Sequence, residues 1–209
     1  MLSILVVLLL GSCTTQSTPV EASTVQIPAN AKVDTATFAG GCFWCVEASF
    51  EQIKGVYEAV SGYAGGKKST ASYKKVSAGM TQHTETVQIY FDPEQISYAT
   101  LVDIFFTAHD PTQLNRQGPD VGTQYRSEVF YHSAAQKDIF ENKVKEWSGE
   151  FNNPIVTRVT PYEAFFIAEE YHQDYERRNP FQPYVMSVSK PKIDRVKAKF
   201  SAIVKEEYR

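Results

Sequence analysis

Cysteine and histidine are scarce in this sequence, and their positions limit the metal chemistry it can carry. The 209 residues include three cysteines, at positions 13, 42 and 45, and four histidines, at 83, 109, 132 and 172. A structural zinc site needs four ligands. The histidines offer no second pair at metal-ligand spacing to accompany Cys42 and Cys45. We therefore expect no bound metal.

Positive charge is not in excess either. Lys and Arg number 21 against 24 Asp and Glu, which gives a formal net charge of -3. Proteins that bind nucleic acid present a basic face to the phosphates, so no nucleic-acid partner is expected. At 43% hydrophobic and 22% charged residues, the composition is that of an ordinary globular domain.

The chain has no apolar run long enough to span a bilayer. Residues 2–10 are nearly all apolar, but such a run covers only about half of a bilayer core. A short run that ends in small residues is typical of a signal peptide. Leu10-Gly11-Ser12-Cys13 also resembles the lipobox of bacterial lipoproteins, whose cysteine is lipidated and becomes the mature N-terminus. No Lys or Arg precedes the run, and the alternative is a buried strand with a structural Cys13.

These features predict three parts of the chain. Residues 1–12 are expected to be a lipoprotein signal peptide, and residues 13–33 a lipidated Cys13 followed by a flexible tether, because that stretch is rich in Ser, Thr, Ala and Pro. Residues 34–209 should form the folded domain. The expected location is the cell envelope, with the protein exported and held on the periplasmic or extracytoplasmic side of a membrane by the lipid on Cys13.

Hydrophobic periodicity within residues 34–209 predicts strands mixed with helices. Strands are expected at 35–39, 85–92, 125–131 and 155–160. Helices are expected before Gly55, at 98–108 with Ser97 as N-cap, at 134–147 and at 191–207. We therefore predict an α+β fold, a two-layer α/β sandwich with a mixed sheet, a ferredoxin-like core and long functional loops. Those loops are residues 57–79 and 110–124, which lack a clear period.

Cys42 and Cys45 are separated by two residues, just after a predicted strand and in the first turn of a predicted helix. Amides and the dipole at a helix N-terminus stabilise negative charge, so this position predicts a thiol more acidic than a free one. The neighbouring Gly40 and Gly41 would let another backbone or a ligand approach the sulfur.

A C-x-x-C pair is compatible with four kinds of site. A zinc site lacks ligands here, and an inert disulfide would close a loop too short to restrict the unfolded chain much. A thioredoxin-like thiol-disulfide oxidoreductase has the same local order of strand, C-x-x-C and helix. The fourth kind is a thiol enzyme that reduces peroxides or sulfoxides.

Other segments favour the fourth kind. GGCFWCVE at 40–47 resembles the catalytic signature of the peptide methionine sulfoxide reductase A family. Further segments follow in that family's order, namely GYAGG at 62–66, HTE at 83–85, FDP at 91–93, HDPTQLNRQGPDVGTQYRS at 109–127 and AEEYHQDY at 168–175. The resemblance covers roughly residues 36 to 185. It implies a peptide-methionine (S)-S-oxide reductase.

The resemblance also implies a role for each site residue. Reducing a sulfoxide requires a thiolate to attack the sulfur, and an acid and hydrogen-bond donors for the departing oxygen. Cys42 would be the nucleophile and become a sulfenic acid, and Glu85 would be the proton donor, kept neutral by burial. The remaining implied site residues are Tyr73 and Tyr125 as donors to the oxygen, Asp120 as a further polar group, and Phe43 and Trp44 as the wall for the substrate methyl group.

Each of these residues also has an ordinary structural interpretation. Glu85 at the start of a strand could be solvated, and Asp120 after Gly118-Pro119 could be a turn residue. The tyrosines could be half-buried surface residues, and the aromatic pair could belong to the core. His83 is assigned a structural role.

After the reaction, the Cys42 sulfenic acid must be reduced back to a thiol, and Cys45 is the candidate for the first step of that reduction. Many family members have recycling cysteines near the C-terminus, whereas no cysteine follows position 45 here. Cys45 would therefore condense with the sulfenic acid to a disulfide, which an external thioredoxin-like dithiol protein would reduce, with no bound cofactor. The substrate would be oxidised methionine, free or in proteins, and a monomer is expected. The alternatives are a thioredoxin-like oxidoreductase and a non-catalytic module that binds methionine-rich proteins through Phe43 and Trp44.

Overall fold

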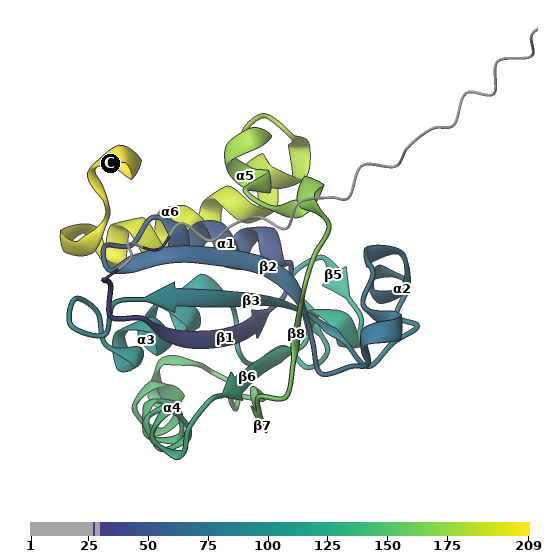
Figure 1. The fold of residues 1–209 in the computed structure, drawn as a ribbon, viewed down its shortest axis with the longest axis horizontal. Coiled ribbons are helices and arrows are strands. Elements are labelled where there is room, and N and C mark those ends of the chain that lie inside the picture. Colours follow the sequence, from purple (N-terminus) through teal and green to yellow (C-terminus); the bar gives the residue numbers. More distant parts are fainter. Residues whose placement is uncertain (1–26, 28–29) are drawn as a thin grey trace, which may run out of the picture.

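Strand β1 (Asp34–Gly40) lies inside a six-stranded sheet with the order β7-β6-β1-β3-β2-β8 (Figure 1). The computed structural model describes residue 27 and residues 30–209, so the predicted signal peptide, Cys13 and most of the predicted tether lie outside the described residues. The other strands are β2 (Val56–Ala64), β3 (Thr84–Phe91), β6 (Ser127–Tyr131), β7 (Arg158–Pro161) and β8 (Phe165–Ile167). The β6–β7 pair is parallel and the other pairs are antiparallel, which makes the sheet mixed.

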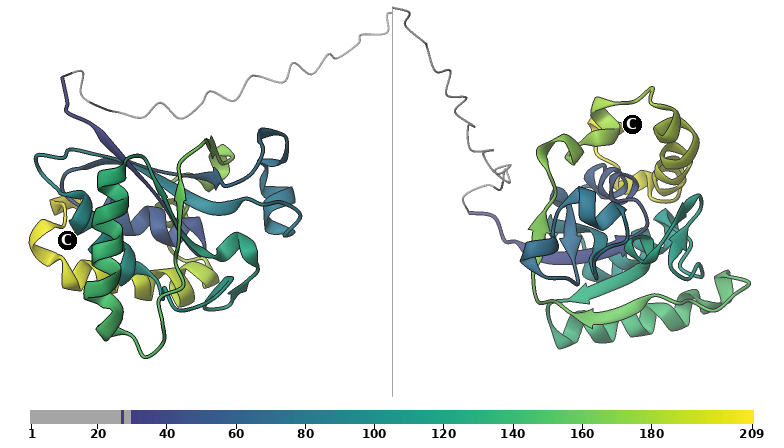
Figure 2. Two further views of the ribbon diagram at one scale, coloured as in Figure 1. Left: turned by 90° about the horizontal axis from the view of Figure 1, so that it is seen from below. Right: turned by 90° about the vertical axis from the view of Figure 1, so that its right-hand side faces the viewer.

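Helices cover one face of this sheet. Helix α1 (Phe43–Glu51) contacts β1, β2 and β3, and α3 (Tyr98–Ala108) contacts β1. Helix α4 (Ala134–Trp147) flanks β6, and α6 (Lys190–Lys199) packs outside α1 and α3 (Figure 2). The shorter helices are α2 (Tyr73–Ser77) and α5 (Tyr175–Arg178). The predicted α+β class with a mixed sheet is confirmed, and α6 adds a further layer over α1 and α3.

The core between sheet and helices is aromatic. The ring of Phe38 on β1 stacks on Phe105 of α3 with centroids 4.9 Å apart, and on Phe50 of α1 at 5.7 Å. All three side chains are fully buried. Offset aromatic pairs of this kind stabilise the core beyond the effect of burial alone. The contacts of Phe38 therefore hold β1 against α1 and α3.

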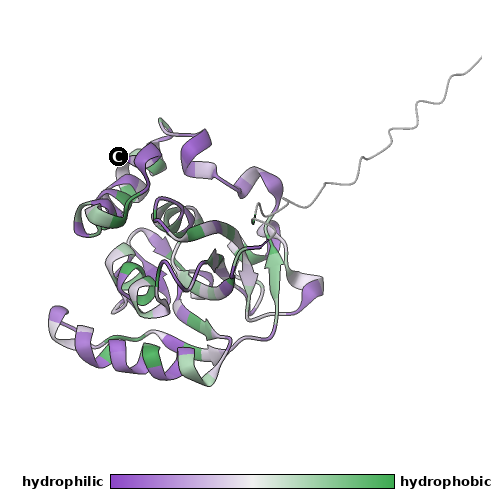
Figure 3. Ribbon diagram, turned by 60° about the vertical axis from the view of Figure 1, so that its left-hand side comes forward, coloured by the Kyte–Doolittle hydropathy of each residue, from purple (hydrophilic) through white to green (hydrophobic). Residues whose placement is uncertain are grey.

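Two helices match their predicted limits. Helix α3 begins after Ser97, whose hydroxyl accepts a hydrogen bond from the backbone N–H of Thr100 over 3.1 Å, as an N-cap should. Helix α4 spans the predicted 134–147. In Figure 3 this long helix, at the bottom, alternates hydrophilic and hydrophobic residues, and its buried side includes Phe140. Amphipathic periodicity thus located both helices correctly.

The prediction that residues 57–79 form a loop is wrong for its first part. Residues 56–64 form β2, which lies between β3 and β8. Most of this strand is buried on both faces, so its sequence does not alternate between apolar and polar residues. Gly62 permits the close approach of β8, because a Cβ at Gly62 would lie 2.5 Å from the carbonyl oxygen of Phe166. Gly62 therefore belongs to a strand, where it allows the neighbouring strand to approach, and does not mark a loop.

Element ends differ elsewhere. Strand β6 begins at Ser127, because Thr123–Tyr125 forms a 3-10 turn, and β7 begins at Arg158 rather than at residue 155. The predicted helix 191–207 is instead α6, followed by two 3-10 turns at Ser201–Ile203 and Glu206–Tyr208. A π-helical turn, Val185–Ser189, precedes α6. The predicted loop 110–124 holds a small hairpin of β4 (Arg116–Gln117) and β5 (Asp120–Val121).

Candidate active site

A cavity of about 230 Å³ opens at the N-terminus of α1. The family resemblance implies eight site residues. Seven of them line this cavity, and the eighth, Cys45, does not. The lining consists of Cys42, Phe43, Trp44, Tyr73, Glu85, Asp120, Tyr125, Gln182 and Tyr184. These residues come from the start of α1, from α2, β3 and β5, from the turn before β6, and from the segment between α5 and α6. The tertiary fold therefore assembles one site from residues spread between positions 42 and 184.

Cys42 is the N-cap residue of α1, and Glu85 is the second residue of β3. The carboxyl of Glu85 is buried, with 2% of the residue exposed, and its Oε2 accepts a hydrogen bond from the backbone N–H of Phe43 over 3.1 Å. Burial raises the pKa of Glu85 to about 8, against the lowering effect of the Phe43 N–H. Glu85 is therefore mostly protonated at neutral pH, as a proton donor must be.

The prediction of an unusually acidic Cys42 is wrong for this structure, in which both thiols are free. The residue is only 6% exposed, and burial raises the pKa of the Cys42 thiol well above its ordinary value. Hydrogen bonding to Cys45 and the charges of Cys45 and Glu85 raise it further. The amide of Phe43 in the first turn donates to Glu85 instead. Without substrate, the position at a helix N-terminus does not compensate for desolvation.

Three phenols and one carboxylate surround the opening. Burial raises the pKa of Tyr73 to about 12 and that of Tyr125 above its ordinary value, so both hydroxyls keep their protons and can donate. The Tyr184 hydroxyl donates to Oδ2 of Asp120 over 2.5 Å. Asp120 is thus not free at the turn, because it orients a phenol that lines the same cavity.

The aromatic wall of the cavity is held from behind by His172. The Nε1–H of Trp44 donates to Nδ1 of His172 over 3.2 Å, and the His172 ring lies 5.0 Å from Phe43 and 4.3 Å from Tyr73. Burial lowers the pKa of His172 to about 4, so its ring is neutral and Nδ1 is available as an acceptor. Trp44 also stacks on Tyr175 with centroids 3.7 Å apart. Phe43 and Trp44 thus have fixed orientations in the wall.

Tyr73 is anchored by Glu169. The backbone N–H of Tyr73 donates to Oε1 of Glu169 over 2.9 Å, and the Tyr63 hydroxyl donates to Oε2 over 2.7 Å. Hydrogen bonds from these groups, opposed by burial, leave the pKa of Glu169 below its ordinary value. The carboxylate therefore fixes the start of α2, from which Tyr73 reaches the cavity.

The glycine before Cys42 is required for its backbone. Gly41 has φ +93°, a conformation that residues with a side chain rarely adopt. A Cβ at Gly41 would lie 2.5 Å from Cβ and Cγ of Gln117. The group that approaches here is a side chain of the 110–124 segment, rather than the backbone or ligand that was expected.

Cys45 lies one turn into α1, outside the cavity lining and only 2% exposed. Its Sγ lies 3.1 Å from the Ser189 hydroxyl and 3.8 Å from Nζ of Lys192. Hydrogen bonding with Cys42 lowers the pKa of Cys45, and Lys192 and Ser189 lower it further, against the effect of burial. The two cysteines thus differ, since the pKa of Cys42 is raised and that of Cys45 is lowered.

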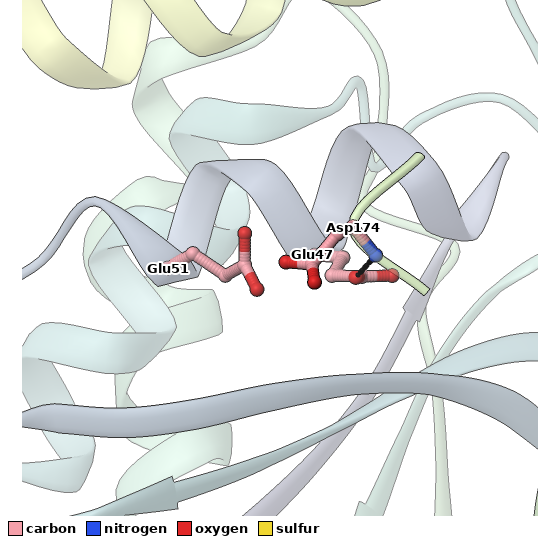
Figure 4. Close-up of side chains that lie close together, drawn as sticks. All are labelled: Glu47, Glu51 and Asp174. Carbon is pink, nitrogen blue, oxygen red and sulfur yellow. Dashed lines mark hydrogen bonds between the residues drawn. The ribbon is translucent and has the colours of Figure 1, made fainter. Parts of the chain in front are cut away.

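In the described part of the chain, one cluster of three acidic residues has the spacing of metal ligands, although no metal was expected. One oxygen from each of Glu47, Glu51 and Asp174 lies within 4.8 Å of the other two (Figure 4). The oxygens of Glu47 already accept hydrogen bonds from the Ser61 hydroxyl and from the Asp174 N–H. Burial raises the pKa of Glu47 to about 8 and that of Glu51 to about 9, so protons rather than an ion can neutralise these carboxyls.

Sequence reasoning missed four residues of the site, Gln182, Tyr184, His172 and Glu169. The last two lie inside AEEYHQDY, a segment whose resemblance was noted but whose residues were given no role. Gln182 and Tyr184 follow Pro180 in a segment without periodicity, and no local pattern marked them. His83, assigned a structural role, is buried with Nε2 3.0 Å from the Lys67 carbonyl oxygen, and does not line the cavity.

Comparison with known proteins agrees with this geometry. The family described as "Peptide methionine sulfoxide reductase" matches residues 34–204. The peptide methionine sulfoxide reductase MsrA 1 of Rhodopirellula baltica is 44% identical over 187 residues, which cover 90% of this chain and 97% of the relative.

Solved structures agree as well. The reduced form of Mxr1 from Saccharomyces cerevisiae is similar with a TM-score of 0.70 and 38% identity, covering 77% of this chain and 92% of the yeast chain. Mxr1 in complex with Trx2 matches with a TM-score of 0.50 and 27% identity, over 73% of this chain and 91% of that one. Among the described residues, the family match spans the six-stranded sheet and all six α-helices, and it selects sulfoxide reduction over thioredoxin-like exchange. The chain belongs to the peptide methionine sulfoxide reductase family.

Proposed function

We propose that this methionine sulfoxide reductase acts on the S epimer of peptide methionine sulfoxide, with Cys42 as its nucleophile. The observation that carries the proposal is the content of one small cavity, which combines a thiol, a protonated carboxyl, three phenols and two aromatic rings. A thiol-disulfide exchanger needs neither the acid nor the phenols. A binding module would need only the rings.

In the first step Cys42 attacks the sulfoxide sulfur. The S–O bond of the sulfoxide and the transient S–S bond to Cys42 then break, and the oxygen is transferred to the Cys42 sulfur. The substrate sulfur gains two electrons and becomes the thioether of methionine, while the Cys42 sulfur loses two and becomes a sulfenic acid. Glu85 protonates the oxygen, and Tyr73 and Tyr125 donate hydrogen bonds to it. No net proton is consumed, because the Cys42 thiol releases one as it attacks. Burial raises the Cys42 pKa, so the thiol of the free enzyme keeps this proton until the attack.

Phe43 and Trp44 would receive the methyl group of the substrate. Both rings line the cavity, and His172 and Tyr175 fix the orientation of Trp44. A wall that fixes the methyl group, together with phenols that fix the oxygen, leaves one position for the rest of the substrate. This arrangement supports selection of a single epimer.

In the second step Cys45 attacks the sulfenic sulfur of Cys42, water leaves, and a Cys42–Cys45 disulfide forms. Hydrogen bonding with Cys42 and the charge of Lys192 both lower the Cys45 pKa. A thioredoxin-like dithiol would then reduce the disulfide. The similarity to Mxr1, solved in complex with Trx2, supports this class of reductant.

The test is conversion of methionine sulfoxide to methionine with dithiothreitol as the reductant. The wild type should form methionine and consume reductant, and Cys42→Ser should form none, because an alkoxide is inaccessible at neutral pH. A binding module would consume no reductant in either case. Substantial activity of Cys42→Ser would place the attacking atom elsewhere.

We further propose a ferredoxin-like core for the fold. The order β6-β1-β3-β2, with α1 connecting β1 to β2 and α3 following β3, is consistent with that topology. Strands β7 and β8 would then be additions at the two edges.

We also propose that Cys13 carries a lipid that holds an exported, monomeric enzyme at a cell-envelope membrane. The lipobox resemblance supports this proposal. Within residue 27 and residues 30–209, no helix combines the length and the apolar character needed to cross a bilayer. Expression in a lipoprotein-processing bacterium tests the anchor, because Cys13→Ser should move the activity from the membrane to the soluble fraction. A wild type that is itself soluble and unmodified would exclude it.

A further inference from the structure

A largely buried polar cluster surrounds Cys45, which does not line the cavity. The Ser189 hydroxyl, fully buried at the end of the π-helical turn, lies 3.1 Å from Cys45 Sγ. Nζ of Lys192, in the first turn of α6, lies 3.8 Å from the same sulfur. In the described part of the chain, the hydrogen-bonding contact of Lys192 is to this sulfur and not to a carboxylate.

Glu176 completes the cluster from α5. The residue is 9% exposed, and Oε1 is a buried oxygen without a hydrogen-bond partner among the described residues. Burial raises the pKa of Glu176, while hydrogen bonding with Ser189 and the charge of Lys192 lower it. The Ser189 hydroxyl thus lies between the Cys45 thiol and the Glu176 carboxyl.

Burying the Ser189 hydroxyl and the Glu176 carboxyl, and partly burying the Lys192 ammonium, costs free energy unless each group is compensated by a partner. A neutral Cys45 thiol is a weak partner for an ammonium, whereas a thiolate is a full one. The cluster is therefore best satisfied when Cys45 carries negative charge and the Glu176 carboxyl holds the proton, with the Ser189 hydroxyl hydrogen-bonding to both groups.

We propose that Lys192, Ser189 and Glu176 are positioning residues that prepare Cys45 as the thiolate for the second step. The proposal rests on the proposed function, in which Cys45 resolves the sulfenic acid of Cys42. The sulfur of Cys45 forms the S–S bond with its electron pair, and the S–O bond of the sulfenic acid breaks. The hydroxide that leaves takes up a proton, from Glu176 through Ser189 or from Glu85, and departs as water. Cys45 is oxidised and the sulfenic sulfur is reduced.

Every titratable group that acts on Cys45 bears on the pH dependence of this step. These groups are Cys42 on α1, Glu85 on β3, Glu176 on α5, Tyr184 before the π-helical turn, and Lys192 on α6. Among them Lys192 alone is a cation. Removing its charge should therefore raise the pH at which Cys45 becomes a thiolate.

The experiment compares Lys192→Met and Lys192→Arg with the wild type in a single turnover without external reductant. Methionine release reports the first step, and the lifetime of the sulfenic acid, trapped by dimedone, reports the second. Lys190→Met is the matched control, because Lys190 lies two residues away and pairs with Asp194 on the exposed side of α6.

We expect Lys192→Met to release methionine at the wild-type rate but to form the disulfide about tenfold more slowly at pH 7, because a smaller fraction of Cys45 is then a thiolate. The deficit should shrink as the pH is raised, Lys192→Arg should restore most of the rate, and Lys190→Met should match the wild type. Ser189→Ala and Glu176→Gln should slow the same step.

Other outcomes would overturn the proposal or the function on which it rests. Disulfide formation by Lys192→Met at the wild-type rate and with the wild-type pH profile would exclude the cluster. An equal slowing of methionine release would assign the cluster to Cys42 instead. A wild type that releases no methionine would contradict the proposed function, whereas a wild type that releases methionine but forms no disulfide would contradict only the resolving role of Cys45.

Discussion

Glu85 accepts a hydrogen bond from the backbone N–H of Phe43 over 3.1 Å, so the acid of the site is attached to the residue that follows the nucleophile. The contact joins β3 to the first turn of α1. Burial keeps the Cys42 thiol protonated at rest, and the neighbouring Glu85 adds to this effect.

Glu85→Gln should slow the first step by roughly 10²–10⁴-fold, the usual contribution of a general acid. Glutamine keeps the size and can still accept the Phe43 N–H, but it has no ionisable proton. Single-turnover methionine yield measures the effect. Infrared titration of the wild type should show a carboxyl that loses its proton near pH 8 and that is missing from the variant. A rate within a few-fold of the wild type would mean that another group supplies the proton.

Cys45→Ser should preserve the first step and stop the cycle after it. The buried serine cannot attack a sulfenic acid, so one methionine forms per enzyme and dimedone then labels Cys42. Turnover with a thioredoxin-like protein should stall. No first-turnover product would mean that Cys45 supports the Cys42 nucleophile directly, and undiminished cycling would mean that the external dithiol attacks the sulfenic acid itself.

The enzyme should reduce the S epimer of methionine sulfoxide and leave the R epimer unchanged. Exchanging methyl group and oxygen between the aromatic wall and the phenols would leave the oxygen without hydrogen-bond donors. Separate assays of the two epimers, with methionine quantified by chromatography, give the answer. Equal rates would contradict the proposed use of the cavity.

Gly41→Ala should destabilise the domain by about 1–3 kcal/mol and also slow the first step. The backbone at Gly41 has φ +93°, and the new Cβ would meet Gln117 at 2.5 Å. Gln117 cannot move away without cost, because its amide exchanges two hydrogen bonds with the Asp110 backbone. Urea unfolding and single-turnover rates are the measurements. The control is Gly149→Ala, where a Cβ meets nothing within 4 Å and no effect is expected.

The free energy of unfolding should fall as the pH rises from about 4.5 to about 9. Burial raises the folded-state pKa of Glu47 to about 8 and that of Glu51 to about 9, from an ordinary value of 4.5. The folded state thus binds these protons more tightly, and the stability they contribute is lost as the pH rises through the folded-state values. Urea unfolding between pH 5 and 9 should show a smaller decline for Glu47→Gln. The exposed control Glu150→Gln should follow the wild type, and an unchanged slope in Glu47→Gln would refute the assignment.

The sequence by itself predicted the helices that have a clear amphipathic period. Helix α4 and the capped start of α3 depend on local patterns, so a single segment contains the information that defines them. The sequence also placed Cys42, Glu85, Tyr73, Tyr125 and Asp120 in one site, through motifs spread along the chain. Strand β2 was missed because burial on both faces removes the alternation that marks a strand.

The tertiary structure determines whether Cys42 and Cys45 are protonated and which residues contact them. Whether Cys42 is acidic depends on how much water reaches it and on the neighbouring Cys45 and Glu85, and the fold sets both. The contacts of Cys45 with Ser189 and Lys192 join residues more than 140 positions apart. Sequence determines which ionisable groups a chain contains, whereas desolvation and neighbouring charge act through space. Only the fold could therefore assign the raised pKa to Cys42 and the lowered one to Cys45.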